Sequence, residues 1–384
     1  MYRELGRTLA IGYCAVSTLA MLGNCATAQN SDLDFGKQSL IPGNSTAGAF
    51  VSTNNPSEIL QIDSSSIQLS PLPDQEYSPV ITSMSASSSG DYLALAGDDH
   101  AIRLVDVKQG EVIQTLEGHD DWTQALCFSK DAKSLFSAGD DGRVLRWKHA
   151  HSATPEEIIR LPFAIRSICI DSSQRLLAIA GFSSKVTVYD LERQLVVLDL
   201  QSEHGDVRVV RFSRDGSKLL AGGRHGDITV WATRDGEKIA EYHEHRDRVY
   251  TAAFDAEGRY VTSAANDRQV ICYDLDSRKA VQAKELGPAK LRSMCLINSE
   301  WIAVAGADNA IHLYDTKRNQ VVAHLQGHKG TVAALTPCGA YLASGSFDTT
   351  VRIWDLESID TQDVNHGKPI SFEPSPLDSR SQIR

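Results

Sequence analysis

The stretch "SGSFDTTVRIWDL", residues 344–356, contains the features that decide the fold. A run of small residues leads to a turn around Asp348, and a β-branched apolar segment then ends at Trp354. Ser344, Asp348 and Trp354 stand at offsets 0, 4 and 10. Polar side chains placed among apolar ones either carry chemistry or hold the backbone in place, and the rest of the chain decides between the two.

The stretch is one copy of an internal repeat. Residues equivalent to Trp354 recur upstream in steps of 40, 41, 42, 42, 42 and 42, at Tyr314, Tyr273, Trp231, Tyr189, Trp147 and Val105. A second, mostly apolar position precedes each by 19 residues in six copies and by 18 in one, at Ala86, Phe128, Ile170, Phe212, Phe254, Leu296 and Leu335. Two marks that stay in register over seven copies indicate a repeat architecture.

Each repeat reads as four short strands. In the fourth copy "VVRFS" (209–213) is an apolar run, "RDG" (214–216) is a turn, and "KLLAGG" and "ITVW" are further strands. "EKIAEYH" (237–243) supplies the last strand of that unit. Four antiparallel strands in a unit of this length predict a β-propeller blade and an all-β fold.

The sequence resembles the WD-repeat (WD40-type) β-propeller family. The resemblance rests on "GHDDW…FSKDAKSLFSAGDDGRVLRW" from Gly118 and "GHKGTV…LASGSFDTTVRIWD" from Gly327. Weaker copies begin near Ile81, Leu161, Glu203, Glu244 and Leu286. The resemblance implies one seven-bladed propeller over residues 57–357. It also implies closure of the last blade by an N-terminal outer strand, which we expect at "SIQLSPL" (66–72).

The Ser, His and Asp of the repeat suggest a hydrolytic triad, but the resemblance implies a structural role. In the family, these side chains form a hydrogen-bonded chain that ends at the buried Trp. The residues expected to do so are His119, Ser137, Asp141, Trp147, His245, Ser263, Asp267, Tyr273, His328, Ser344, Asp348 and Trp354. Copies that depart from the pattern, such as the first and the fourth, are expected to rely more on apolar packing.

The N-terminus predicts an export signal over residues 1–28. Arg3 and Arg7 precede an uncharged apolar run of about 15 residues, which is shorter than the roughly 20 needed to span a bilayer. Ala26-Thr27-Ala28 fits a small-x-small cleavage site. A buried N-terminal element and a lipoprotein anchored at Cys25 are the alternatives. Residues 29–56 are expected to be a polar linker and residues 358–384 a disordered tail.

Charge and cysteine content restrict the function further. The formal net charge of the chain is -11, which disfavours a nucleic-acid partner. Cleavage at Ala28 would leave 36 basic and 48 acidic residues, or -12, and five cysteines. Cys127, Cys169 and Cys295 lie at equivalent repeat positions, and side chains related by rotation about one axis do not face one another. We therefore expect buried thiols and no disulfide.

The repeat register predicts a binding rim. In WD-repeat proteins, the residue one past the start of each first strand looks out at the channel mouth on one face, here called the top face. These residues are Thr82, Gln124, Arg166, Arg208, Tyr250, Arg292 and Thr331, or Ala333 if the last strand starts two residues later. Nearby candidates for contact with a partner are Trp122, Phe182, Arg224, Arg248, Asn266 and Lys290. Arg and Tyr recur at interface hot spots, so the rim predicts a protein or peptide partner that carries acidic groups. Alternatively, the arginines pair with Asp206, Asp227 and Asp247.

The histidine pairs at 149–151 and 243–245 could ligate a metal, but no third ligand follows from spacing, so we expect no metal and no cofactor. The favoured hypothesis is an exported, non-enzymatic scaffold that binds another protein through its top face. An exported propeller enzyme or small-ligand binder at the channel mouth is the main alternative. A subunit of an envelope complex held by its tails is another.

Overall fold

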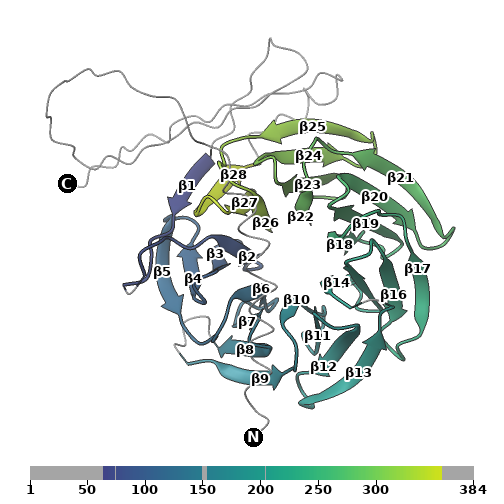
Figure 1. The fold of residues 1–384 in the computed structure, drawn as a ribbon, viewed down its shortest axis with the longest axis horizontal. Coiled ribbons are helices and arrows are strands. Elements are labelled where there is room, and N and C mark those ends of the chain that lie inside the picture. The colour runs from purple at the N-terminus through teal and green to yellow at the C-terminus, as the bar shows by residue number, and fades with distance from the viewer. Residues whose placement is uncertain (1–63, 74, 149–153, 204, 357–384) are drawn as a thin grey trace, which may run out of the picture. The chain divides into compact units, whose positions relative to one another are not determined.

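The computed structural model describes residues 64–73, 75–148, 154–203 and 205–356. The predictions for residues 1–28, 29–56 and 358–384 lie outside these ranges. The described residues form seven four-stranded antiparallel sheets, which surround a central channel as blades (Figure 1). The prediction of an all-β, seven-bladed propeller is confirmed.

The strands are numbered along the chain, and the first strand of each blade lines the channel. Blade 1 contains β2 (Ile81–Ala86), β3 (Tyr92–Gly97), β4 (Ile102–Asp106) and β5 (Glu111–Leu116). Blade 2 contains β6 (Thr123–Phe128), β7 (Ser134–Gly139), β8 (Arg143–Lys148) and β9 (Glu156–Arg160). Blade 3 contains β10 (Ile165–Ile170), β11 (Leu176–Gly181), β12 (Lys185–Asp190) and β13 (Leu195–Gln201).

The remaining blades follow the same order. Blade 4 contains β14 (Val207–Phe212), β15 (Lys218–Gly223), β16 (Ile228–Ala232) and β17 (Lys238–Tyr242). Blade 5 contains β18 (Val249–Phe254), β19 (Tyr260–Ala265), β20 (Gln269–Asp274) and β21 (Lys279–Glu285). Blade 6 contains β22 (Leu291–Leu296), β23 (Trp301–Gly306), β24 (Ile311–Asp315) and β25 (Gln320–Leu325). Blade 7 contains β26 (Val332–Cys338), β27 (Tyr341–Ser346), β28 (Thr350–Asp355) and β1 (Ser64–Gln68).

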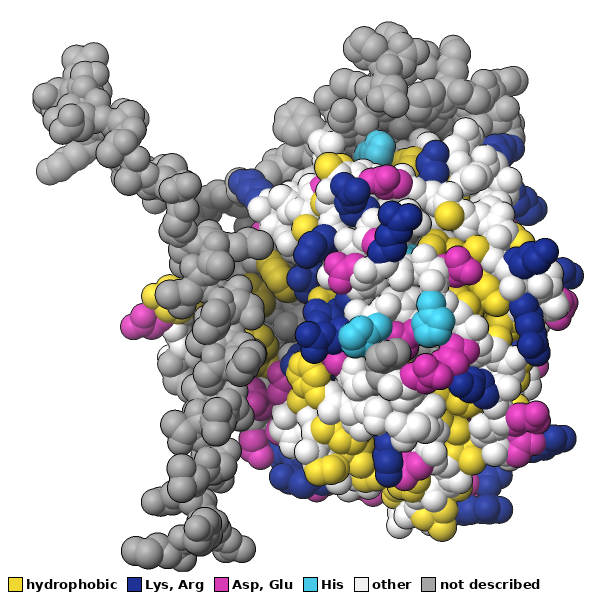
Figure 2. All heavy atoms as spheres, turned by 45° about the vertical axis from the view of Figure 1, so that its right-hand side comes forward, with side chains coloured by type: hydrophobic (Ala, Val, Ile, Leu, Met, Phe, Trp, Pro, Cys, Tyr) yellow, Lys and Arg dark blue, Asp and Glu magenta, His cyan; other side chains and the backbone are white. Residues whose placement is uncertain are grey.

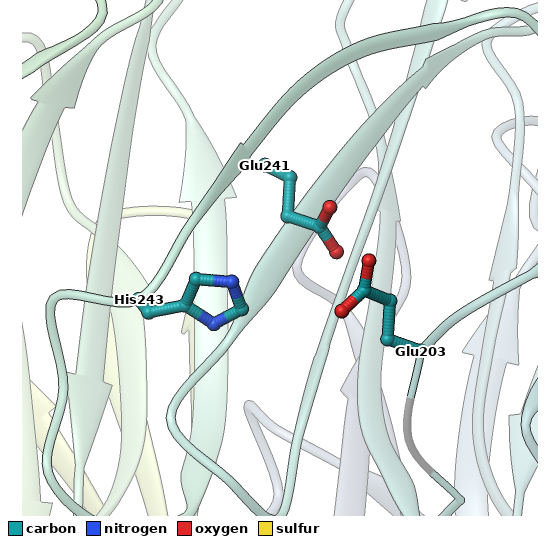
Figure 3. A group of neighbouring side chains, drawn as sticks. All are labelled: Glu203, Glu241 and His243. Carbon is teal, nitrogen blue, oxygen red and sulfur yellow. The ribbon is translucent and has the colours of Figure 1, made fainter.

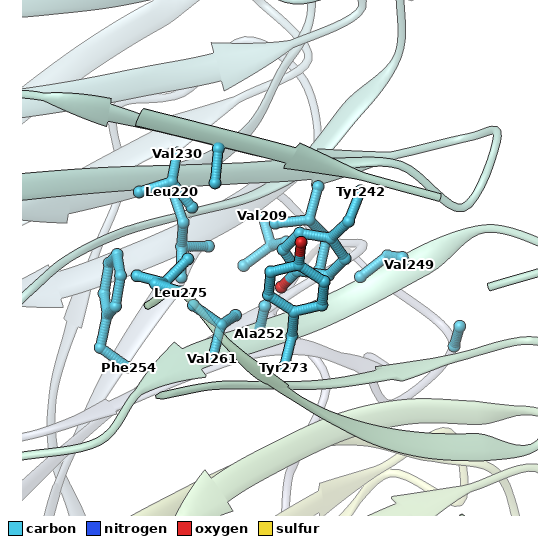
Figure 4. Packing of buried hydrophobic residues seen from close by; sticks show 13 residues of the cluster. Val209, Leu220, Val230, Tyr242, Val249, Ala252, Phe254, Val261, Tyr273 and Leu275 are labelled. Carbon is cyan, nitrogen blue, oxygen red and sulfur yellow. The ribbon is translucent and has the colours of Figure 1, made fainter. Parts of the chain in front are cut away.

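The hydrophobic core lies between the blades. The second and third strands of a blade are covered on both faces by neighbouring blades, so they are near-continuous apolar runs such as "LLAIAG" in β11. The outer strands face solvent on one side and keep alternating or polar sequences. Between blades 4 and 5, Tyr242 and Tyr273 stack with their ring centroids 3.8 Å apart (Figure 4).

The ring is closed by the N-terminal strand, as predicted. β1 pairs antiparallel with β28, from Ser64 opposite Trp354 to Gln68 opposite Thr350. The strand therefore begins two residues before the predicted start at Ser66 and ends before the predicted end at Leu72. The pairing covers the edge of β28 and buries Ile67 and Leu69.

The last blade differs from the others in the register of its first strand. β26 begins at Val332, so Ala333, and not Thr331, is its second residue. Leu335 pairs with Ser344 in the way that Leu126 pairs with Ser137 in blade 2. The repeat position assigned to Leu335 from the sequence corresponds to Phe128, so that assignment is two residues out of register. The cause is the turn that follows, because only two residues separate β26 from β27 whereas five separate β6 from β7.

No helix long and apolar enough to cross a membrane occurs in the part of the chain that the structure describes.

Candidate functional site

The channel mouth on the top face is built by a β-bulge in every blade. In each first strand the pairing with the second strand shifts between its first and third residues, for example between Ile165 and Ser167 in β10. A bulge leaves one residue unpaired and re-aims its side chain. The bulged residues are Thr82, Gln124, Arg166, Arg208, Tyr250, Arg292 and Ala333, and all seven line a hollow of about 350 Å³.

The structure places most of the predicted contact residues around this hollow. Trp122 lines it directly, and Phe182 contacts two of the rim arginines. Arg248 adjoins Tyr250, because its guanidinium donates to the Tyr250 hydroxyl at 3.2 Å. Arg224 and Lys290 are exposed but do not line the hollow.

Three cations near the mouth are paired with carboxylates. Arg166 forms an ion pair with Asp140 at 3.1 Å. Arg208 and Arg248 share Asp206, the latter at 3.2 Å. The alternative expectation, that the arginines pair with neighbouring carboxylates, therefore describes these three residues. Asp140 was not among the predicted partners.

Arg292 differs from these three. No described carboxylate lies within ion-pair distance of its guanidinium, whereas each of the other three has such a partner. The guanidinium instead lies 4.9 Å from the centroid of the Tyr250 ring. Burial alone would raise the pKa of the Tyr250 phenol, but the charges of Arg292, Arg248 and Arg208 lower it below its usual value.

Aromatic side chains complete the mouth. Phe182 lies beneath the guanidinium groups of Arg166 and Arg208, at 4.5 and 4.7 Å. Phe347 also lines the hollow and was not among the predicted contact residues. The repeat register could have found it, because Phe182 follows β11 as Phe347 follows β27. By the same register Asp140, which follows β7, occupies the equivalent place in blade 2.

The Ser-His-Asp sets are hydrogen-bonded chains inside the blades. In blade 2, His119 bonds Asp141 at 2.9 Å and Ser137 at 2.8 Å, and the Trp147 indole N–H donates to the Ser137 hydroxyl at 2.9 Å. Blade 7 repeats this arrangement with His328, Asp348, Ser344 and Trp354. In blade 5, His245 bonds Asp267 and Ser263, while Tyr273 replaces the Trp. The three serines are fully buried, so no substrate can reach their hydroxyl groups.

Blade 1, which was expected to rely more on apolar packing, contains a buried ion pair. Asp99 holds the position of Asp141 in the repeat and binds Arg103 from β4 at 2.5 Å, with both side chains buried. Blade 6 has a similar substitution, because His312 from β24 binds Asp308 at 2.7 Å. In both blades a basic residue of the third strand takes the place of the loop histidine.

One group of potential metal ligands occurs among the described residues. Glu203, Glu241 and His243 point toward one another at the seam of blades 3 and 4, with their ligand atoms within 4.8 Å (Figure 3). Glu203 and Glu241 are the additional potential ligands for His243 that the spacing of residues in the sequence did not indicate. However, the Lys238 ammonium already lies 2.7 Å from Glu241 and 3.8 Å from Glu203, so a cation of the protein fills this place. Basic and acidic side chains are interspersed over this side of the molecule (Figure 2).

The five described cysteines are free thiols. Burial raises the pKa of Cys127 and Cys295 to about 12 and that of Cys338 to about 11. These thiols stay protonated near neutral pH and are poor nucleophiles.

Comparisons with known proteins agree with the repeat architecture. The family described as "WD domain, G-beta repeat" matches residues 110–148, 196–232, 236–274 and 319–355. Each match begins at or within the outer strand of one blade and ends with the third strand of the next blade.

Curated relatives match at low identity. The chain is 25% identical over 297 residues to "Nuclear distribution protein nudF" of Aspergillus niger, covering 73% of this chain and 58% of the relative. It is 25% identical over 273 residues to "Guanine nucleotide-binding protein subunit beta" of Saccharomyces cerevisiae, covering 67% and 64%. A third relative is "Periodic tryptophan protein 2 homolog" of Caenorhabditis elegans, 21% identical over 260 residues, covering 65% and 29%. The chain thus spans less than two thirds of the length of each of these relatives.

Proposed function

Because the chain belongs to the WD40-repeat β-propeller family, whose members are typically protein-interaction scaffolds, we propose that it is a non-enzymatic scaffold that binds another protein through the channel mouth of its top face. The observation that carries this proposal is the set of exposed aromatic side chains around the hollow. Trp122, Phe182 and Phe347 are 44%, 46% and 41% exposed, and Phe182 contacts the rim arginines Arg166 and Arg208. Large aromatic and Arg side chains supply most of the free energy of binding at protein interfaces.

The chemistry of the hollow favours binding over catalysis. Its described lining contains no His, Cys, Asp or Glu side chain. General acid–base catalysis most often uses such groups, and the Ser, Thr and Tyr hydroxyls of the lining would need an adjacent base to act as nucleophiles. The lining offers instead guanidinium, hydroxyl, amide and aromatic groups, which suit recognition.

Export of the protein is part of the proposal and rests on the sequence of residues 1–28 alone. Cleavage after Ala28 would leave Gln29 as the first residue of the mature chain. The mass of the protein purified from its source tests this directly. A mass that includes residues 1–28 would contradict cleavage, and an acyl group on Cys25 would indicate the lipoprotein alternative.

The interaction surface is tested by comparing two double variants in co-purification from the source organism. Trp122→Ser with Phe347→Ser removes two exposed aromatic side chains at the mouth. Leu195→Ser with Val281→Ser removes two comparably exposed apolar side chains from the outer strands β13 and β21. We expect the mouth variant to lose the protein that co-purifies with the wild type, while both variants melt like the wild type. Loss with the outer-strand variant, or retention with the mouth variant, would contradict the proposal.

A further inference from the structure

We propose that Arg292 and Tyr250 form a seat for one side-chain carboxylate of the partner, and that Trp122 and Phe347 receive an apolar side chain from the same segment. This inference rests on the proposed function and names the chemistry that the channel mouth selects.

The charge of Arg292 is available to a ligand. Arg166 is already paired with Asp140, and Arg208 and Arg248 share Asp206. Arg292 has no such carboxylate among the described residues. A carboxylate that reaches this guanidinium would gain charge-assisted hydrogen bonds without displacing an existing ion pair.

Tyr250 adds a second donor beside Arg292. Its hydroxyl oxygen accepts a hydrogen bond from Arg248 at 3.2 Å, which leaves the phenolic O–H free to donate. Its ring lies against the Arg292 guanidinium and limits the directions in which that group can point. The two donors therefore stand beside each other on adjacent blades, 5 and 6.

The seat fits a singly charged group better than a doubly charged one. Among the arginines at the rim, Arg292 alone lacks an ion pair with a described carboxylate, and Asp140 and Asp206 lie beside the others. Arg211 also lines the hollow, but it lies three residues further along β14 than Arg208 and donates to the Val210 carbonyl at 2.8 Å. A phosphate carries about -1.5 to -2 at neutral pH and would meet repulsion from both aspartates. A side-chain carboxylate needs one neutralising cation, and the site offers one.

The bulged residues on the opposite arc of the mouth are uncharged, and Gln124 among them donates to Asp140 at 3.2 Å. Blades 7, 1 and 2 contribute Ala333, Thr82 and Gln124 to the hollow. Trp122 and Phe347 stand at its two ends with 44% and 41% of their surface exposed. Exposed aromatic side chains beside a cationic arc match a segment that combines an acidic and a large apolar residue.

The test uses a display library of random 12-residue peptides selected on the full chain, followed by labelled synthetic peptides. We expect selected peptides to contain Asp or Glu together with a large apolar residue. Replacing that acid by its amide should weaken binding to the wild type at least about tenfold, as expected for a hot-spot contact. On Arg292→Met the same replacement should have no effect. Arg214→Met is the matched control, because Arg214 is exposed in the turn between β14 and β15 and does not line the hollow, and it should bind like the wild type.

The outcomes separate this inference from the proposed function. Peptides that require Trp122 and Phe347 but tolerate loss of their acid would overturn the carboxylate seat and leave the interaction surface in place. Peptides that ignore the mouth variants altogether would count against both. A phosphoserine peptide that binds more tightly than its Glu counterpart would show that the seat takes dianions and would overturn the choice of carboxylate.

A spectroscopic readout distinguishes a direct contact from a structural effect. A carboxylate bound at Arg292 offsets positive charge beside the Tyr250 phenol, so the ionisation of Tyr250, followed by ultraviolet absorbance, should shift to higher pH when the acidic peptide binds. Tyr250→Phe should abolish this absorbance change. An unchanged titration in the presence of saturating acidic peptide would overturn the seat.

Discussion

Ser344 is the junction of a buried polar chain. Its hydroxyl accepts a hydrogen bond from the Trp354 indole N–H and can donate to His328 Nε2, while His328 Nδ1 bonds Asp348. Every donor in this chain finds an acceptor, which is what burial of such groups requires. The repeated Ser-His-Asp sets thus stabilise blades 2, 5 and 7 from within.

Removal of this hydroxyl should destabilise the protein. Ser344→Ala leaves a buried indole N–H and a buried imidazole nitrogen without partners, and each such group costs about 1–3 kcal/mol. Ser299→Ala, on an exposed turn, serves as the control. Equilibrium unfolding in urea measures the difference in stability between the two variants. Equal unfolding midpoints would contradict a stabilising role for the Ser344 hydroxyl.

His324 should make the protein sensitive to moderate acid. His324 Nδ1 lies 2.8 Å from His312 Nδ1, and His312 Nε2 bonds Asp308. Burial, followed by the charge of His312, lowers the pKa of His324 from 6.5 to about 4. The folded state then binds fewer protons than the unfolded state between these values, so the stability present above pH 6.5 falls as the pH drops toward 4.

The measurement is the urea midpoint between pH 7 and pH 4.5 for the wild type and for His324→Gln. The variant lacks the titrating group, so its midpoint should fall less steeply over this range. Parallel curves for the two proteins would show that His324 does not govern the acid sensitivity.

At the scale of the elements, the bulge in each first strand links the sheet to the site. The shifted pairing after the first residue turns one side chain per blade toward the channel. The repeat alone predicted these positions in six blades. The position in blade 7 was ambiguous because the register of β26 depends on the length of the turn that follows it. The spacing of apolar residues does not indicate that length.

The closing strand β1 offers a test at this scale. Ile67 faces the core with 8% of its surface exposed, whereas Ser66 faces solvent. Ile67→Lys should lower the free energy of unfolding by at least about 2 kcal/mol, because it inserts a charge into the seam of blade 7. Ser66→Lys should change it little. Similar thermal midpoints for the two variants would contradict closure by this strand.

At the scale of the whole molecule, the repeat predicts the fold more fully than it predicts the site. Seven copies in register determine the blades, and the outer strand at the N-terminus completes them. Whether each rim cation is paired with a carboxylate depends instead on a side chain from a different loop. Arg166 meets Asp140 from the preceding blade, and no spacing rule indicates that contact. Arg292 stays unpaired because blade 6 places no carboxylate beside it among the described residues.

The measurement that tests the central claim most directly is site-specific photocrosslinking in the source cells. A photoreactive phenylalanine analogue replaces Phe182 or Phe347 at the mouth, or Val281 or Leu195 on the outer strands, all of them more than 40% exposed. Binding through the channel mouth predicts that the first two positions form a covalent adduct with one shared protein and that the last two do not. Adducts only from the outer strands, or equal adducts from all four positions, would contradict it.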